Sequence, residues 1–113
     1  MVETLHILVL EDEPNDAALE IAELENAGFQ CRWHRVETKE DFLQHLKDNQ
    51  YDLVLADNNL PSFDGMEALH LFRGQHFEEP FIIISGTIGE EIAIEFQKSR
   101  IPRDTRPVAP LAL

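Results

Sequence analysis

The sequence contains a single cysteine, Cys31, among 113 residues. One thiol excludes an internal disulfide and any metal site built from cysteines, and it is typical of proteins in a reducing compartment. The apolar runs reach only about six residues, far short of the roughly 20 that cross a bilayer. The first residues, MVETLH, lack the basic start of a secretory signal. We therefore expect a cytoplasmic protein.

Basic residues are also scarce, since 9 Lys and Arg stand against 22 Asp and Glu, for a formal net charge of -13. This balance argues against a basic face that binds nucleic acid or an anionic membrane. It favours a protein that collects cations or binds basic partners, although an acidic surface also serves solubility alone. The glycine motifs G-x-x-x-x-G-K-S/T and G-x-G-x-x-G, which bind nucleotides, are absent.

The hydrophobic residues, 43% of the chain, are enough for the core of one domain. Three short runs are almost continuously apolar and predict buried strands: residues 5–10, 53–56 and 81–84. A fourth segment alternates instead, with Phe29, Cys31 and Trp33 separated by polar residues. That pattern predicts a half-exposed strand near the edge of a sheet.

Helical patterns follow each of these strands. Pro14 suits the first turn of a helix whose apolar residues Ala17, Ile21 and Leu24 recur at helical spacing before Gly28. Two more helices are expected to begin at capping pairs, which are Thr38 with Asp41 and Asp64 with Glu67. Their expected buried faces are Phe42, Leu43 and Leu46 in one, and Met66, Leu69 and Phe72 in the other. A fourth helix is expected after Gly89, with Ile92, Ala93 and Phe96.

The resulting order, in which strands and helices alternate, predicts an α/β fold with a parallel sheet covered by helices on both faces. Composition changes after Ser99, because residues 100–113 carry three prolines, three arginines and one acid. Proline lacks the N–H that a central strand needs. We therefore divide the chain into a domain over residues 1–99 and an irregular Pro- and Arg-rich tail over residues 100–113.

Acidic and hydroxyl residues follow three of the predicted strands. Glu11 and Asp12 follow the first strand, Asp57 ends the third, and Ser85 follows the fourth. The carboxyl ends of parallel strands meet at one edge of the sheet, where ligands bind. Clustered carboxylates need a compensating cation or raised pKa values, and Mg²⁺ is the natural occupant of an all-oxygen site. Taken singly, each residue has a simpler interpretation as a helix cap or a turn residue.

Four segments carry a specific family resemblance: ILVLEDEP (7–14), YDLVLADNNLP (51–61), FDGMEAL (63–69) and PFIIISG (80–86). Over about residues 5–99 the chain resembles the receiver domain of two-component response regulators. The resemblance implies a flavodoxin-like, doubly wound sheet with strand order 2-1-3-4 in this chain. It also implies a signalling module that catalyses only its own phosphorylation and dephosphorylation, and that acts through a downstream protein partner.

Carried onto this sequence, the resemblance makes Asp57 the acceptor of a phosphoryl group from a histidine kinase or phosphotransfer protein. Glu11, Asp12 and Asp57 would hold Mg²⁺ together with the backbone carbonyl of Asn59, and Ser85 would be the switch hydroxyl. Glu11 stands where the family usually has Asp. We expect this change to be tolerated, because the side chain is one methylene longer and keeps its carboxylate.

The end of the sequence departs from the family pattern. Receivers continue with a fifth strand that carries an aromatic residue, then a Lys and a fifth helix, whereas no Lys or aromatic residue follows Ser99. We interpret the tail as a truncation or a change of reading frame. The absence of this Lys leaves an alternative open, which is a degenerate receiver that only binds or dimerises. A phosphatase of the haloacid dehalogenase type would need Asp at position 59, which is Asn59.

Two further expectations concern regions outside the acidic edge. Without a fifth strand, residues 81–84 form an apolar sheet edge, and such edges pair with other chains. We therefore expect a homodimer through this strand. The five histidines show no metal-ligand spacing in the sequence, and we interpret them as surface or packing residues: His6, His34, His45, His70 and His76.

Overall fold

Four parallel strands form one sheet in the order β2-β1-β3-β4, in a computed structural model that describes residues 4–57, 60 and 63–84. The strands are β1 (Thr4–Leu10), β2 (Gln30–Val36), β3 (Leu53–Asp57) and β4 (Phe81–Ile84). The helices between them are α1 (Pro14–Asn26), α2 (Lys39–Asp48) and α3 (Gly65–Gly74). The predicted doubly wound, flavodoxin-like fold and its strand order are confirmed.

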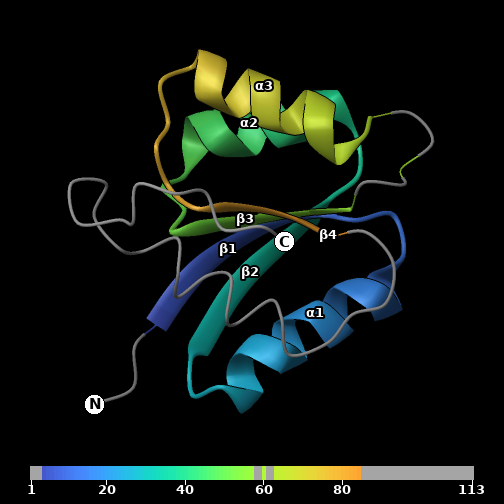
Figure 1. The fold of residues 1–113 in the computed structure, drawn as a ribbon, viewed down its shortest axis with the longest axis vertical. Helices are drawn as coiled ribbons and strands as arrows, with labels where there is room; N and C mark the ends of the chain where they lie inside the picture. The colour runs from blue at the N-terminus through green and yellow to red at the C-terminus, as the bar shows by residue number, and fades with distance from the viewer. Residues whose placement is uncertain (1–3, 58–59, 61–62, 85–113) are drawn as a thin grey trace, which may run out of the picture.

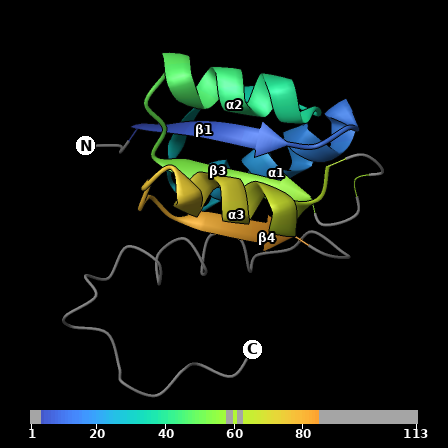
Figure 2. The ribbon, with the colours of Figure 1, turned by 90° about the horizontal axis from the view of Figure 1, so that it is seen from above.

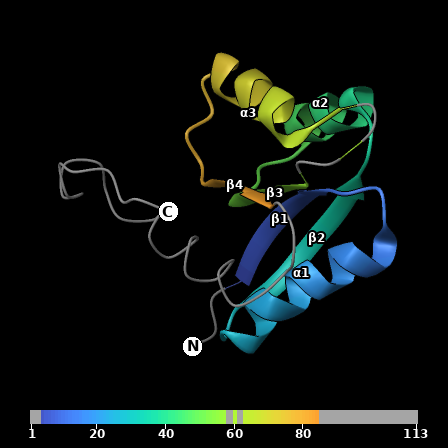
Figure 3. The ribbon, with the colours of Figure 1, turned by 45° about the vertical axis from the view of Figure 1, so that its right-hand side comes forward.

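Helices cover both faces of the sheet, with α1 on one face and α2 and α3 on the other (Figure 1). The same two-sided arrangement is visible in Figure 3, whereas Figure 2 looks onto the face that carries α2 and α3, with α1 behind the strands. Successive residues of a strand point to opposite faces, so Ile7 and Val9 pack with α1 while Leu8 and Leu10 pack with α2 and α3. All four side chains are fully buried, which explains why β1 is an unbroken apolar run rather than an alternating one.

The edge strand β2 shows the alternation that the sequence predicted. Cys31 and Trp33 are half-buried against the α1 side of the core, whereas Gln30, Arg32 and His34 are exposed. Gly28, just before the strand, has φ +104, a conformation that side chains with a Cβ rarely adopt. Glycine therefore allows the tight turn from α1 into β2.

The helix starts follow the predicted capping pairs. The Thr38 hydroxyl accepts a hydrogen bond from the Asp41 N–H at 3.2 Å, and the Asp64 carboxylate accepts one from the Glu67 N–H at 2.9 Å. Each bond satisfies an N–H that has no partner within the helix. Capping is a local property of the sequence, which is why these two starts could be predicted.

One predicted helix face is wrong. Met66 was expected to point with Leu69 and Phe72, but its side chain is 48% exposed. The buried residues of α3 are Gly65, Ala68 and Phe72. Residues in a helix are about 100° apart, so Met66 lies well to the side of the stripe that Ala68 and Phe72 define.

The close approach of α3 to the sheet favours glycine at its first position. A Cβ on Gly65 would lie 3.2 Å from Ile83 Cγ2 and 3.5 Å from the Asp57 carbonyl oxygen. The small residue thus lets the start of α3 lie directly against the ends of β3 and β4.

The predicted helix after Gly89 and the tail over residues 100–113 lie outside the described residues, so the domain division remains a prediction. None of the described helices combines the length and the apolar character that crossing a membrane requires.

Candidate functional site

The predicted acidic edge is formed by two neighbouring strands. β1 pairs with β3 in parallel, with Leu10 opposite Ala56. The next residue of each strand is therefore an acid, Glu11 after β1 and Asp57 at the end of β3. Carboxylate oxygens of Glu11, Asp12 and Asp57 lie within 4.8 Å of one another. Asp12 is exposed and Asp57 partly buried, so the cluster opens to solvent.

Backbone hydrogen bonds hold Glu11 in place. Its N–H donates to the Val36 carbonyl at 2.9 Å, and its carbonyl oxygen accepts from Arg35 Nη1 at 3.1 Å. One carboxylate oxygen accepts the N–H of Glu13 at 3.2 Å. Pro14 then begins α1, so the turn from strand to helix is short and the acids stay at the sheet edge. The side chain of Glu11 therefore has a defined position.

Glu11 is a buried acid, with 3% of its surface exposed. Burial raises its pKa to about 7; a hydrogen bond with Asp12 and the charge of Asp57 act in the same direction, while the Glu13 N–H acts against them. Burial disfavours the charged form of a carboxyl, and a nearby like charge does the same. A cation at this position would relieve both penalties.

Beneath the cluster lies a fourth acid, Glu20 of α1, which the sequence analysis missed. Glu20 is completely buried, and neither side-chain oxygen has a hydrogen-bond partner. Burial, followed by the charge of Glu11, raises its pKa to about 8. Glu20 lies at helical spacing from Ala17 and Leu24, on the apolar face of α1. That spacing was the signal in the sequence for its burial.

The donor set suits a hard divalent cation. Every side-chain ligand in the cluster is a carboxylate oxygen, the kind that Mg²⁺ prefers, and an open side leaves room for the waters that Mg²⁺ retains. The two other residues assigned to the site from the resemblance, Asn59 and Ser85, lie outside the described residues. Their roles therefore remain predictions.

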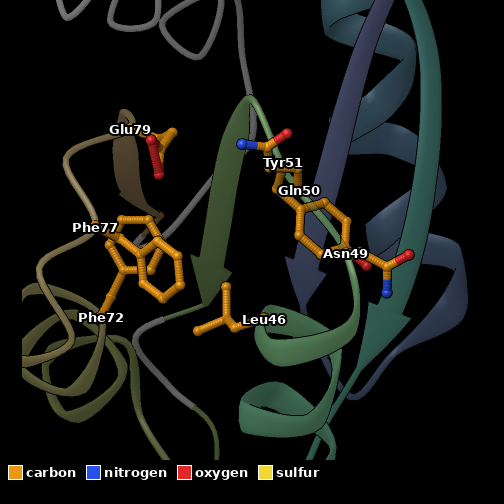
Figure 4. Close-up of a pocket in the computed structure, with 7 residues that line it drawn as sticks. All are labelled: Leu46, Asn49, Gln50, Tyr51, Phe72, Phe77 and Glu79. Atoms are coloured by element: carbon orange, nitrogen blue, oxygen red, sulfur yellow. The ribbon is translucent and has the colours of Figure 1, made fainter.

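A pocket of about 80 Å³ lies toward the other end of the strands from the acidic cluster. Its lining includes Tyr51, which precedes β3, and Phe72 and Phe77 at the end of α3 (Figure 4). The acids stand at the opposite, carboxyl end of β3. The pocket therefore takes no part in the candidate site.

The chain thus combines a doubly wound parallel sheet with an acidic cluster at the carboxyl ends of two neighbouring strands. The sequence matches the response regulator receiver domain family over residues 7–101. The chain therefore belongs to this family, and its class is that of the two-component signalling proteins.

Three known proteins illustrate the similarity. The two-component response regulator ORR41 of Oryza sativa subsp. japonica is 32% identical over 83 residues, which cover 72% of this chain and 65% of the rice protein. The receiver domain of the Francisella response regulator 1452 is 27% identical, with a TM-score of 0.60 over 84% of this chain and 77% of that one. The chain thus spans less than two thirds of the rice relative.

The third is the receiver domain of the sensor histidine kinase PA1611 from Pseudomonas aeruginosa PAO1. It is 28% identical, with a TM-score of 0.58 over 71% of this chain and 66% of that one. Its structure has a magnesium ion coordinated in the active site cleft.

Proposed function

We propose that this chain is a phosphoacceptor receiver, in which Asp57 accepts a phosphoryl group from a histidine kinase or phosphotransfer protein in the cytoplasm. The observation that carries the proposal is the convergence of Glu11, Asp12 and Asp57 at the ends of two adjacent parallel strands. Mg²⁺ would be held by these three carboxylates and by the backbone carbonyl of Asn59. When bound, it neutralises charge on the incoming phosphoryl group.

Residues of the chain itself have separate roles in the phosphoryl transfer. An oxygen of Asp57 forms the new bond to phosphorus while the bond between phosphorus and the donor nitrogen breaks, which gives an acyl phosphate. Glu11, held by the Glu13 N–H, keeps its carboxylate directed at the same point. Ser85 is assigned the hydrogen bond to the phosphoryl oxygens and thus the signal to a downstream protein partner.

The test is intact-mass spectrometry after incubation with Mg²⁺ and a small phosphodonor. We expect the unaltered protein to gain one phosphoryl group and Asp57→Asn to gain none, because the amide is not a nucleophile. Asp48→Asn, at an exposed position of α2, is the matched control and should behave like the unaltered protein. Equal labelling of Asp57→Asn would show that another residue is the acceptor.

A degenerate receiver that only binds or dimerises is the second candidate, because residues 100–113 contain no Lys that could pair with the phosphoryl group. A folded protein that binds Mg²⁺ but gains no phosphoryl group in the same experiment would favour it.

A homodimer through β4 is part of either proposal. In the described sheet β4 is an end strand that pairs with β3, and its four residues are all apolar. We expect the mass measured by light scattering to rise with concentration toward that of two chains. A mass of one chain over the whole concentration range would contradict this expectation.

A further inference from the structure

Three histidines that lie far apart in the sequence come together on the α2 side of the sheet. His6 is on β1, His34 is on the edge strand β2 and His45 is on α2, while Tyr51 precedes β3. The ring centroids of His6 and His34 are 5.5 Å apart, and those of His34 and His45 are 5.2 Å apart. We call His6, His34, His45 and Tyr51 the histidine cluster.

One phenol oxygen connects α2 to the edge strand. The Tyr51 hydroxyl lies 3.1 Å from His34 Nδ1 and 3.0 Å from His45 Nδ1. A phenol has one hydrogen to donate, and an imidazole nitrogen either donates or accepts. Both bonds form together when Tyr51 donates to one ring and accepts an N–H from the other. In this arrangement the ring that accepts the phenol hydrogen is neutral, whereas N–H donors on both rings would leave the phenol hydrogen without an imidazole acceptor.

The tautomer of His6 follows from its partner. His6 Nδ1 lies 2.9 Å from the Gln50 carbonyl oxygen, and a carbonyl only accepts, so Nδ1 carries a hydrogen. In the neutral ring Nε2 then has a lone pair, and this atom is buried without a hydrogen-bond partner. A proton on His6 Nε2 would place an N–H in the same buried position with nothing to accept it.

The surroundings oppose positive charge on His34. His34 is exposed overall, but partial loss of water around its ring lowers its pKa, and the neighbouring His45, His6 and Arg32 lower it further. One acid near the cluster is Asp52, whose carboxylate accepts the backbone N–H of His6 at 2.8 Å. A metal ion is a poorer explanation, because among the described residues the acids of the candidate site are the group whose ligand atoms converge on one point.

We propose that the histidine cluster is a proton-sensitive latch. It holds α2 against β2 and the segment before β3, and protonation at acid pH releases α2. Protonation of the accepting imidazole turns both Nδ1 atoms into donors toward Tyr51, so the phenol hydrogen loses its acceptor. A second proton places like charges on rings 5.2 Å apart. This device is independent of phosphorylation at Asp57, and it would make the docking of α2 respond to pH.

The direction in which pH changes the stability of the docked α2 follows from the lowered pKa of His34. The unfolded or undocked chain binds the proton at a higher pH than the docked chain does. The docked state is therefore fully stabilised above the ordinary histidine pKa of about 6.5, and the stabilisation is lost as the pH falls through the pKa of the cluster.

Hydrogen exchange resolved by helix tests the latch in the full chain. After correction for the intrinsic pH dependence, we expect exchange in α2 to speed up relative to α3 between pH 7.5 and 5.5. The increase should be about tenfold for each unit by which the pKa of His34 lies below that of an exposed histidine. An α2 that keeps pace with α3 at every pH would overturn the proposal.

Variants separate the latch from general acid lability. His34→Gln keeps a hydrogen-bonding group but does not titrate, so α2 should stay protected at pH 5.5. Tyr51→Phe removes the shared oxygen, so α2 should exchange faster already at pH 7.5. His70→Gln, an exposed residue of α3, should leave the profile unchanged. The same pH dependence in His34→Gln as in the unaltered protein would refute the latch.

A measurement on the unaltered protein covers the case in which a variant does not fold. NMR titration of the imidazole protons should show His34 titrating below the pKa of about 6.5 of an exposed histidine. Titration of His34 at the pKa of an exposed imidazole would also overturn the proposal.

Discussion

Replacing Glu20 with leucine is expected to stabilise the protein, and by more at pH 8 than at pH 6. Glu20 is fully buried on the apolar face of α1, and the group that acts most strongly on its carboxyl is another acid, Glu11. Burying an ionised group without a partner is costly, and a leucine of similar size adds apolar contacts instead. The gain should be several kcal/mol at alkaline pH, at about 1.4 kcal/mol for each unit of pKa shift.

The pH dependence follows from the raised pKa of Glu20, which moves from 4.5 to about 8. Between these values the folded state keeps a proton that the unfolded chain loses, so stability falls as the pH rises. The contribution is fully present below pH 4.5 and is lost as the pH rises through 8. Glu11, with a pKa of about 7, adds a similar slope at lower pH, so the interval from pH 7 to 8 isolates Glu20 best.

Urea unfolding at pH 6, 7 and 8 in the presence of a chelator measures this effect. Glu20→Leu should flatten the fall in the free energy of unfolding between pH 7 and 8. Glu25→Leu, at an exposed position of the same helix, is the matched control and should keep the slope of the unaltered protein. Parallel curves for Glu20→Leu and the unaltered protein would mean that Glu20 does not hold its proton in the folded state.

Magnesium affinity is expected to rise about tenfold between pH 6 and pH 8, as the share of ionised Glu11 rises from about one tenth to nine tenths around its pKa of about 7. A divalent cation binds the carboxylate and not the carboxylic acid, so binding displaces the proton. The direction and the size of this change in Mg²⁺ affinity thus both follow from the burial of Glu11, together with the charge of Asp57.

Isothermal titration calorimetry in two buffers of different ionisation heat measures this linkage. At pH 6 the heat should depend on the buffer, because a proton is released as Mg²⁺ binds. At pH 8 the heat should depend little on the buffer through Glu11, since that group is already ionised and has no proton to release. Glu11→Gln should bind weakly with a flatter pH profile. A buffer-independent heat at pH 6 would show that Mg²⁺ binds without displacing a proton.

The elements of this fold were predictable because their signals are local. The apolar run of β1 and the pairs Thr38–Asp41 and Asp64–Glu67 act within a few residues, and the structure contains all of them. The buried face of α3 was harder to predict from the sequence. Apolar character alone suggested that Met66 is buried, whereas the sheet receives the side of the helix with Gly65 and Ala68.

The acidic edge could be predicted for a different reason. Residues that end parallel strands must meet at one edge, so Glu11 and Asp57 needed only the strand order to become neighbours. Glu20 was missed because an acid on an apolar helix face contradicts the usual pattern. Its position at helical spacing from Ala17 and Leu24 shows that geometry places it inside regardless of its charge.

By itself, the sequence determined the family, the alternation of strands and helices and the identity of the acids at the strand ends, because each is written in short motifs and local periodicity. The tertiary structure alone decided that Glu20 lies beneath Glu11 and that His6, His34 and His45 surround Tyr51. Such contacts depend on which strands are neighbours and on how a helix crosses them. Spacing along the chain does not encode these distances.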